Sequence, residues 1–426
     1  MAGAKAPSKK RRNIKSIILF LFYGSFILSV CIVSAWARSA ERSYTCGSLR
    51  SMARVYMASG GYEKAQPLLE QALHLAERTS ASDIELCACV LDLAYLYKNQ
   101  GKLTDAETMC RLGLKLQEKV YSESHPYVAY TLRILSEIYQ GQARYREAAD
   151  ALERAMTIML RVSREDDQEI APFKVDMARL LMAQGDLTKS ESYFNEAIAI
   201  IEKSYGPNHL YTTKVLSSMA TLYVLQERYA EAEELISRTL PIQEKIYGPD
   251  HHFLVPVWLV KSKVYQAKGD MVNAKKLLEK SLSTVENRAN SGHSSEGDIL
   301  SRLGEFYIMN KEYTKAEDVL QRALKVLESS KGTNSDDTAI ALNNLAKVYL
   351  NQNKYSEAQS LCRKALNTLE SIFDEHHPNV ADVLETLVQL HLKTGNRTEA
   401  ARLEQRAEEI RMLKGVTHTP IAKAIE

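Results

Sequence analysis

A period of 42 residues governs this chain from Ser48 onward. A small residue returns at nine positions, first after 41 residues and then seven times after 42. A bulky residue, most often tyrosine, stands nine positions before each small one. Repetition at this length is typical of arrays whose units cannot bury an apolar face alone. The small positions are Ala65, Ala106, Ala148, Ser190, Ala232, Ala274, Ala316, Ala358 and Ala400, and the bulky ones are Tyr56, Tyr97, Tyr139, Leu181, Tyr223, Tyr265, Tyr307, Tyr349 and His391.

These columns predict a helical hairpin in each unit. Small residues let paired helices approach closely, while the bulky residue fills the space beside them. In the eighth unit, apolar residues at helical spacing predict helices over Ala339–Gln352 and Ser356–Ser371, with a turn at Asn353-Lys354. We therefore predict an all-α fold, a right-handed α-solenoid of nine tandem helix-turn-helix repeats over residues 48–414, with a flexible tail at 415–426. Glycines that can end a first helix with a positive φ occupy the turn at Gly60, Gly101, Gly185, Gly269 and Gly395.

Several stretches also resemble a known family. The resemblance is carried by Ala341-Leu342-Asn343-Asn344-Leu345-Ala346-Lys347-Val348-Tyr349, Tyr355-Ser356-Glu357-Ala358, Lys364-Ala365-Leu366 and the loop Tyr247-Gly248-Pro249-Asp250-His251. It is closest to the tetratricopeptide repeat in its 42-residue, kinesin-light-chain-like form. The resemblance implies that first helices line a concave surface where peptides bind. Lys261, Ser190 and Pro241 depart from the family pattern, and Pro241 should remove one hydrogen bond from a second helix and kink it.

The N-terminal segment has the pattern of a membrane signal. Six basic residues, Lys5 to Lys15, precede an uncharged, mostly apolar run from Ile17 to Ala35. Its length favours a retained transmembrane anchor over a cleaved signal peptide, although Ala35-Trp36-Ala37 has the form of a cleavage site. The basic cluster should remain cytoplasmic, which places the repeats on the exported side of a single-pass membrane protein, the periplasm in a bacterium. Cleavage near Ala37 would instead give a secreted or lumenal scaffold.

Composition and motifs argue against catalysis and against nucleic-acid binding. Hydrophobic residues make up 45% and charged residues 25%, as in folded protein. Without the six N-terminal basic residues the body is slightly acidic, unlike a nucleic-acid binder. Nucleotide, zinc and nucleophile motifs are missing from the sequence, so we expect no enzyme, no cofactor and no metal site. A hydrolase with an unrecognisable site is the remaining alternative of another class.

Histidines and cysteines follow the same period. His125, His209, His251, His293 and His377 all lie nineteen residues after a small position, which marks one recurring loop position and separates the copies too widely for a shared metal. Cys110 and Cys362 share a second-helix position and should be buried. Cys46 and Cys87 occupy equivalent points on adjacent first helices, where a disulfide would need local fraying because neighbouring axes lie about 8 to 10 Å apart.

The groove-facing positions of the first helices supply the candidate binding residues. They are predominantly basic in the first six repeats and more acidic later, with Asp298, Glu305, Asp382 and Glu385. Arginine grips carboxylates through paired hydrogen bonds, so we predict a protein partner with an acidic or carboxylate-ended segment. In kinesin light chains a paired Asn holds peptide backbone, and here Asn343-Asn344 is the one intact copy. The predicted groove residues are Arg50, Arg54, Tyr95, Arg133, Arg179, Lys214, Lys263, Asn343, Asn344 and Lys347.

Overall fold

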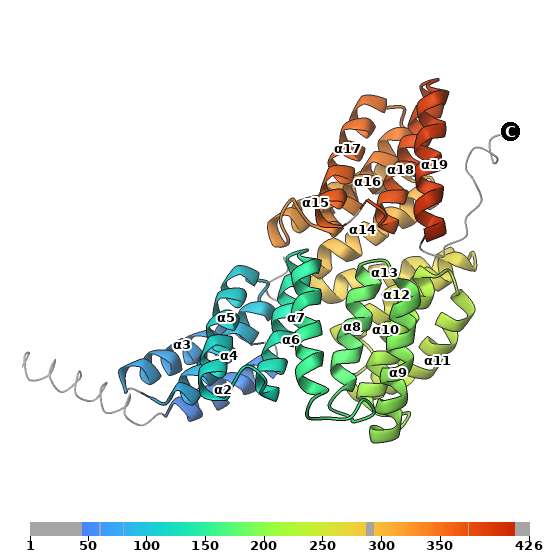
Figure 1. Cartoon of the computed structure of the whole chain (residues 1–426). Helices are drawn as coiled ribbons and strands as arrows, with labels where there is room; N and C mark the ends of the chain where they lie inside the picture. The colour runs from blue at the N-terminus through green and yellow to red at the C-terminus, as the bar shows by residue number, and fades with distance from the viewer. Residues whose placement is uncertain (1–44, 59–60, 80, 287–293, 374, 414–426) are drawn as a thin grey trace, which may run out of the picture. The chain divides into compact units, whose positions relative to one another are not determined.

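A computed structural model describes residues 45–413 apart from 59–60, 80, 287–293 and 374. In this part of the chain all regular structure is helical, and helices α2 to α19 pair as tandem helix-turn-helix repeats (Figure 1). The predicted all-α repeat solenoid is therefore confirmed. The predicted anchor at Ile17–Ala35, the cleavage site at Ala37 and the tail at 415–426 lie outside the described residues. No helix among the described residues is both long enough and apolar enough to cross a membrane.

The chain divides into two compact units, Met1–Leu96 and Tyr97–Glu426. In the first unit, α2 (Cys46–Ala58) and α3 (Tyr62–Arg78) form a hairpin, and α4 (Asp83–Asn99) begins the next repeat and runs across the boundary. In the second unit the first helices are α6 (Pro126–Gly141), α8 (Ala171–Ala183), α10 (Leu210–Leu225), α12 (Val255–Ala267), α14 (Ser294–Met309), α16 (Asp336–Asn351) and α18 (Pro378–Lys393). The second helices are α5 (Leu103–Val120), α7 (Tyr145–Met159), α9 (Leu187–Tyr205), α11 (Tyr229–Tyr247), α13 (Met271–Glu286), α15 (Tyr313–Ser330), α17 (Tyr355–Ile372) and α19 (Arg397–Leu413), with a short 3-10 helix η1 (His252–Leu254) before α12.

The small column forms the contact between the helices of each pair. The side chains of Ala106, Ala148 and Ala232 are completely buried, as the sequence predicts. Ser190 replaces alanine in this column and is equally buried, because its Oγ donates a 2.7 Å hydrogen bond to the carbonyl of Ala178. Lys261, the other departure from the apolar pattern, places its ammonium 5.7 Å from the centre of the Tyr265 ring. Helix α11 continues through Pro241.

Turns within the hairpins require a positive φ. Gly101, Gly185, Gly269 and Gly395 adopt φ between 75° and 80°, which confirms the predicted role of these glycines; Gly60 lies outside the described residues. Four non-glycine residues occupy the same turn in the other repeats at φ between 58° and 61°, a conformation that costs an L-residue roughly 1–2 kcal/mol. They are Ala143, Glu227, Lys311 and Asn353.

Histidines cap three first helices, α6, α10 and α18, and the short helix η1 before α12. Nδ1 of His125, His209, His251 and His377 each accepts a 3.2 Å hydrogen bond from the backbone amide two residues later. The recurring loop position thus satisfies a helix N-terminus. In the eighth repeat Ser335 caps instead, which starts α16 at Asp336, three residues before the predicted Ala339. The capping oxygen explains the earlier start, since apolar periodicity alone does not detect it.

The described cysteines, Cys46, Cys87, Cys89, Cys110 and Cys362, are buried thiols outside any disulfide. Cys110 and Cys362 are buried at their shared position, as predicted. In the first unit Cys46 shares a core cluster with Cys89, and burial raises the pKa of the Cys89 thiol to about 11. Cys89, two residues after the predicted partner Cys87, is therefore the cysteine that packs in this cluster.

Candidate functional site

In the first unit, two predicted groove arginines meet one carboxylate. Arg50 Nε lies 2.6 Å from Asp92 Oδ2, and Arg54 Nη2 lies 2.8 Å from Asp92 Oδ1. Asp92 belongs to the next first helix, α4, so the pair joins neighbouring repeats. Tyr95, on the same helix, exposes 46% of its surface. The charge of these arginines is thus shared with a neighbouring acid.

The second unit repeats this arrangement. Lys98 pairs with Glu137 on α6. Arg133 Nη1 lies 3.3 Å from Asp176 Oδ2, and Arg179 Nη1 lies 3.7 Å from the other oxygen of that carboxylate. Both contacts are long, and burial raises the pKa of Asp176 to about 6. The Nε of Arg133 is buried without a hydrogen-bond acceptor among the described residues, although its guanidinium lies 5.7 Å from the centre of the Phe173 ring.

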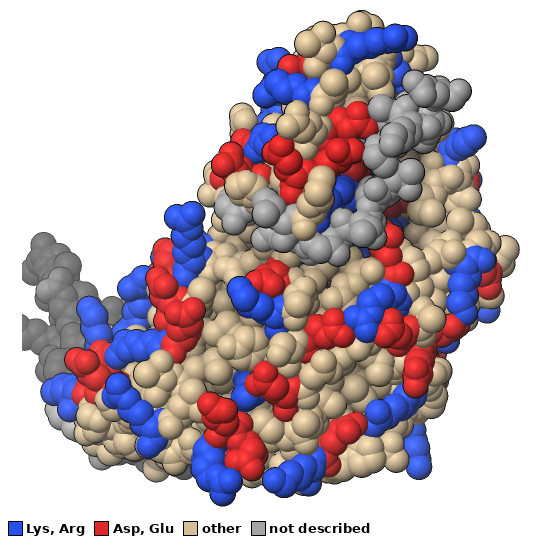
Figure 2. All heavy atoms as spheres, turned by 45° about the vertical axis from the view of Figure 1, so that its right-hand side comes forward, with Lys and Arg blue, Asp and Glu red and all other residues tan. Residues whose placement is uncertain are grey.

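Lys214 occupies the groove position of the fifth repeat. Its ammonium lies 5.5 Å from the centre of the Tyr247 ring and 5.4 Å from that of Phe253. Such cation–π contacts hold a lysine against an aromatic surface without neutralising it. Figure 2 shows basic and acidic side chains interleaved over most of one face, with no single-sign band across it. Neighbouring acids therefore reduce the positive charge of the predicted groove without removing it, because Asp92 and Asp176 are each shared by two arginines and Lys214 keeps its charge.

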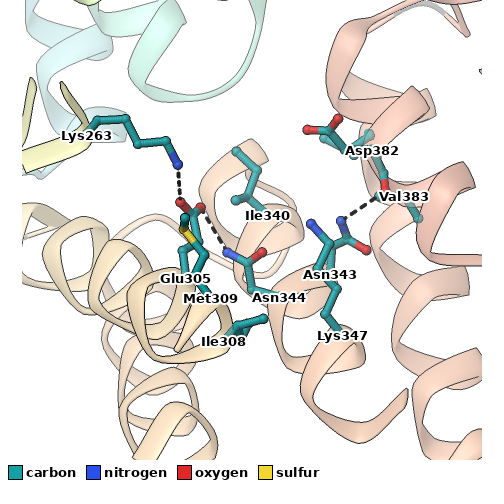
Figure 3. Close-up of a pocket in the computed structure, with 11 residues that line it drawn as sticks. Lys263, Glu305, Ile308, Met309, Ile340, Asn343, Asn344, Lys347, Asp382 and Val383 are labelled. Carbon is teal, nitrogen blue, oxygen red and sulfur yellow. Dashed lines mark hydrogen bonds and ion pairs between the residues drawn. The ribbon is translucent and has the colours of Figure 1, made fainter. Parts of the chain in front are cut away.

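A pocket of about 290 Å³ lies on the first helices of the sixth to ninth repeats (Figure 3). Its wall includes the predicted residues Lys263 on α12 and Asn343, Asn344 and Lys347 on α16. The structure thus brings four of the ten predicted site residues together. The other lining residues are Glu305, Ile308 and Met309 on α14, Ile340 on α16, Leu369 on α17, and Asp382 and Val383 on α18.

Glu305 is the charged centre of this pocket. Lys263 Nζ lies 3.3 Å from its Oε2, and Asn344 Nδ2 donates a 3.1 Å hydrogen bond to its Oε1, so both side chains converge on it (Figure 3). Burial opposes ionisation of Glu305, but Lys263 and two further cations, Arg302 and Lys347, hold the pKa of Glu305 below its usual value. The carboxylate is therefore ionised at neutral pH and fixes the Asn344 amide.

Asn343 has an unsatisfied acceptor. Its Nδ2 donates a 3.4 Å hydrogen bond to the backbone carbonyl of Asp382 (Figure 3), whereas its Oδ1 is buried and has no hydrogen-bond partner in the described part of the chain. The residue is only 4% exposed. A buried polar atom without a partner costs about 1–3 kcal/mol, so a ligand N–H that reached it would be favoured. Lys347, one turn further along α16, makes no ion pair with any described residue.

The far wall of the pocket is partly neutralised. Arg411 on α19 lies 3.2 Å from Asp382 Oδ1 and also pairs with Glu385. One cation of the last helix thus offsets part of the charge of two predicted acidic groove residues. Arg411 lies on a second helix, whereas the repeat pattern marks groove-facing positions on first helices, so the sequence pattern does not indicate this residue.

Comparison with known proteins agrees with this architecture. Sequence profiles of the tetratricopeptide repeat match residues 86–161, 169–244, 211–287, 295–371 and 352–412, and a second profile of this repeat matches residues 48–80. These segments cover more than half of the chain. It belongs to the tetratricopeptide repeat family. The profiles therefore confirm the family that the sequence motifs indicated.

Curated relatives of this tetratricopeptide repeat chain are distant. Protein KINESIN LIGHT CHAIN-RELATED 1 of Arabidopsis thaliana is 26% identical over 141 residues, which cover 33% of this chain and 23% of the relative. The clustered mitochondria protein homolog of Homo sapiens is 26% identical over 144 residues, 34% of this chain and 11% of that protein. The matches thus span less than a quarter of the length of these relatives.

A solved structure extends the fold comparison over most of the chain. The Rap protein complexed with competence and sporulation factor superimposes with a TM-score of 0.63 and 14% sequence identity, and covers 87% of this chain and 98% of that chain. At this identity the likeness establishes a shared fold. The matching family profiles are those of a tetratricopeptide repeat, a module that binds proteins and is generally not catalytic.

Proposed function

We propose that this tetratricopeptide repeat protein is a non-enzymatic scaffold that binds an extended segment of a partner protein, with the pocket on α12 to α18 as the anchoring site. The observation that carries the proposal is the buried Oδ1 of Asn343 beside the ammonium of Lys347, the first without a hydrogen bond and the second without an ion pair to any described residue. An extended segment offers backbone N–H groups to such an acceptor and a carboxylate to such a cation. The Rap protein, which shares the fold, was solved with a bound factor, which supports use of this fold for binding.

The pocket walls also specify the side chain that the segment would insert. Ile308, Met309 and Ile340 offer an apolar surface, and Met309 is 51% exposed. We infer an aliphatic side chain in the pocket, followed by an acidic residue or chain terminus near Lys347. An aliphatic anchor contributes roughly 1.5–3 kcal/mol when it is fully buried.

Photo-crosslinking in cells tests this proposal. A photoreactive amino acid at Met309 should capture one abundant partner, identified by mass spectrometry. Asn343→Ala and Lys347→Glu should each remove most of the adduct. Asn351→Ala is the matched control, since Asn351 lies on α16 and its amide bonds only to the carbonyl of Lys347 within the same helix. An adduct that persists in both pocket variants would contradict the proposal.

We further propose that Ile17–Ala35 tethers the scaffold to a membrane with its repeats on the exported side. The length of this apolar run and the basic residues before it support the tether. N-terminal sequencing of the mature protein, with alkaline extraction of membranes, distinguishes the two forms. An intact N-terminus in the membrane pellet supports the anchor. A new N-terminus after Ala37 in the soluble fraction supports the secreted form and rules out the tether.

A further inference from the structure

Two stretches of the second unit meet although they lie far apart in the sequence. His377 Nε2 lies 2.9 Å from the backbone carbonyl of Ala183, 194 residues earlier. Tyr145 Oη lies 2.9 Å from Asp336 Oδ2, 191 residues later. The third and fourth repeats thus contact the eighth and ninth. The two contacts therefore join the start and the end of the segment from Tyr145 to His377. Helices α12 and α14 of the pocket lie within this segment.

The contact of Tyr145 is aromatic as well as polar. Tyr145, at the start of α7, is buried and stacks on Phe373 with ring centres 4.8 Å apart. Phe373 stacks in turn on His377 at 3.7 Å. In three other loops the equivalent histidine stacks on a tyrosine of its own loop, as His125 does on Tyr121. Phe373 therefore packs against both His377 in its own loop and Tyr145 on the distant helix α7.

The contact between His377 and Ala183 depends on both ring nitrogens of the histidine. Nδ1 accepts from the amide of Asn379 and caps α18, and because that nitrogen is an acceptor, Nε2 carries the proton and donates to Ala183. The capping bond alone recurs in the other three loops. Among the four described capping histidines, His377 is thus the one whose Nε2 also bonds to a turn far along the chain, the α8–α9 turn.

The third contact is steric. A Cβ on Gly185 would lie 2.4 Å from Cδ of Pro378, so only glycine allows the α8–α9 turn to approach the start of α18 this closely. Gly101, Gly269 and Gly395 occupy the same turn position with similar φ, but a Cβ there would meet nothing within 4 Å. The requirement at Gly185 therefore goes beyond the turn itself.

These contacts lie one helical turn from the pocket. Asp336 stands four residues before Ile340 on α16, and Pro378 stands four residues before Asp382 on α18, which places each pair on one face of its helix. Any movement of the two helix starts would therefore change the distance between the pocket walls. The Asn343 amide, which already bridges α16 to α18, lies on this same path.

We propose that Tyr145, Ala183 and Gly185 on one side, and Asp336, Phe373, His377 and Pro378 on the other, form a latch that sets the spacing of α16 and α18 at the pocket. Opening the latch separates these helices and weakens binding of the partner segment. The effect on binding rests on the function proposed above, whereas the latch itself does not. Because a partner that bridges α16 and α18 favours their closed spacing, its binding also favours latch closure.

Electron–electron distance measurements on the full chain test the latch without a partner. Spin labels at Thr188→Cys and Glu375→Cys, both exposed, report on the two sides, with Cys31→Ser to remove the thiol outside the described residues. The otherwise native protein should give one narrow distance distribution. Gly185→Ala should broaden it and shift it to longer distances, while Gly269→Ala, which carries the same backbone strain without the clash, should leave it unchanged. A broad distribution in the native protein, or a native-like one in Gly185→Ala, would overturn the latch.

Milder variants cover the case in which Gly185→Ala does not fold. His377→Asn keeps a side-chain acceptor for the helix cap but cannot reach Ala183. His209→Asn is its control, because His209 makes the same capping bond and stacks only on the nearby ring of Tyr205 among the described loops. The latch requires broadening in the first variant and not in the second. Equal distributions in the two would count against it.

The coupling to the pocket is read from the Met309 crosslink. Gly185→Ala should reduce the adduct at least fivefold relative to Gly269→Ala. Longer distances with an undiminished adduct would refute the coupling and leave the latch. A chain that yields no adduct even in its native form fails the proposed function, while the distance measurement still decides the latch.

Discussion

Within the second unit, the groove at the third and fourth repeats of the array differs from the groove at the sixth to ninth repeats. Around Arg133 and Arg179 two cations share the carboxylate of Asp176, which offsets part of the basic character read from the sequence. Around Asn343 the buried Oδ1 has no hydrogen-bond partner among the described residues, and Lys347 makes no ion pair with any of them, although its charge helps to lower the pKa of Glu305. Groove positions and helix types are the same in both regions. Each region holds a buried group without a partner among the described residues, Nε of Arg133 in one and Oδ1 of Asn343 in the other. The comparison teaches that such a group marks a candidate binding site where it also lines a pocket, as Asn343 does beside Lys347.

The largest expected effect is on partner binding at the pocket. Asn343→Ala removes the free acceptor and the bond to α18, which corresponds to about 1–3 kcal/mol and thus roughly a 5-fold to 150-fold loss of affinity. Arg133→Ala and Arg179→Ala together should change affinity less than about threefold, because each cation is already shared with Asp176. Titration calorimetry with the captured segment measures both. A reversed order would place the site at the arginines.

Glu305→Gln should lower the stability of the pocket region by roughly 1–2 kcal/mol, because Lys263 and Asn344 lose an ionised acceptor. The pKa of Glu305 is lowered in the folded protein, so its contribution is present at neutral pH. It is lost as pH falls below the ordinary carboxyl range and through the folded value. Urea unfolding at pH 7 and pH 3 measures this difference. A gap between native protein and variant that stays constant with pH would contradict the assignment.

Asp176 should show the opposite dependence on pH. Its pKa is raised to about 6, so the folded protein binds the proton more tightly than the unfolded chain does, and stability falls as pH rises from about 4 to about 6. We expect Asp176→Asn to remove a loss on the order of 1 kcal/mol over this range. Thermal unfolding of both proteins at pH 4.5 and pH 7 checks it. Parallel changes in the two would show that the ion pairs with arginine outweigh burial.

The smallest expected effect separates the two arginines of the first unit. Arg50 exposes 17% of its side chain and Arg54 exposes 59%, although both contact Asp92. Arg50→Ala should cost about 1 kcal/mol and Arg54→Ala less than about 0.5 kcal/mol, since exposed pairs are screened by water. Unfolding midpoints in low and high salt measure both losses. Equal losses would mean that Asp92 holds the two arginines alike.

Much of the candidate site was within reach of the sequence. The period placed Lys263, Asn343, Asn344 and Lys347 on groove-facing positions, and the structure gathers them in one pocket. Glu305 stands at the same offset from the small column as Glu137, so its position was also visible. Its role was not, because the sequence does not say that Lys263 and Asn344 turn toward it. The same holds for Arg411, whose partners lie on a neighbouring helix.

The sequence by itself determined the repeat, the hairpin, the alternation of small and large residues and the turn glycines. These features are local, and a 42-residue period restates the same local rule in every unit. Tertiary structure alone decided which cations are neutralised, which Asn343 atom lacks a partner, and that Tyr145 and His377 close the second unit onto itself. Such contacts depend on how the stacked repeats curve. That curvature sums small rotations between neighbours, and no single repeat encodes the sum.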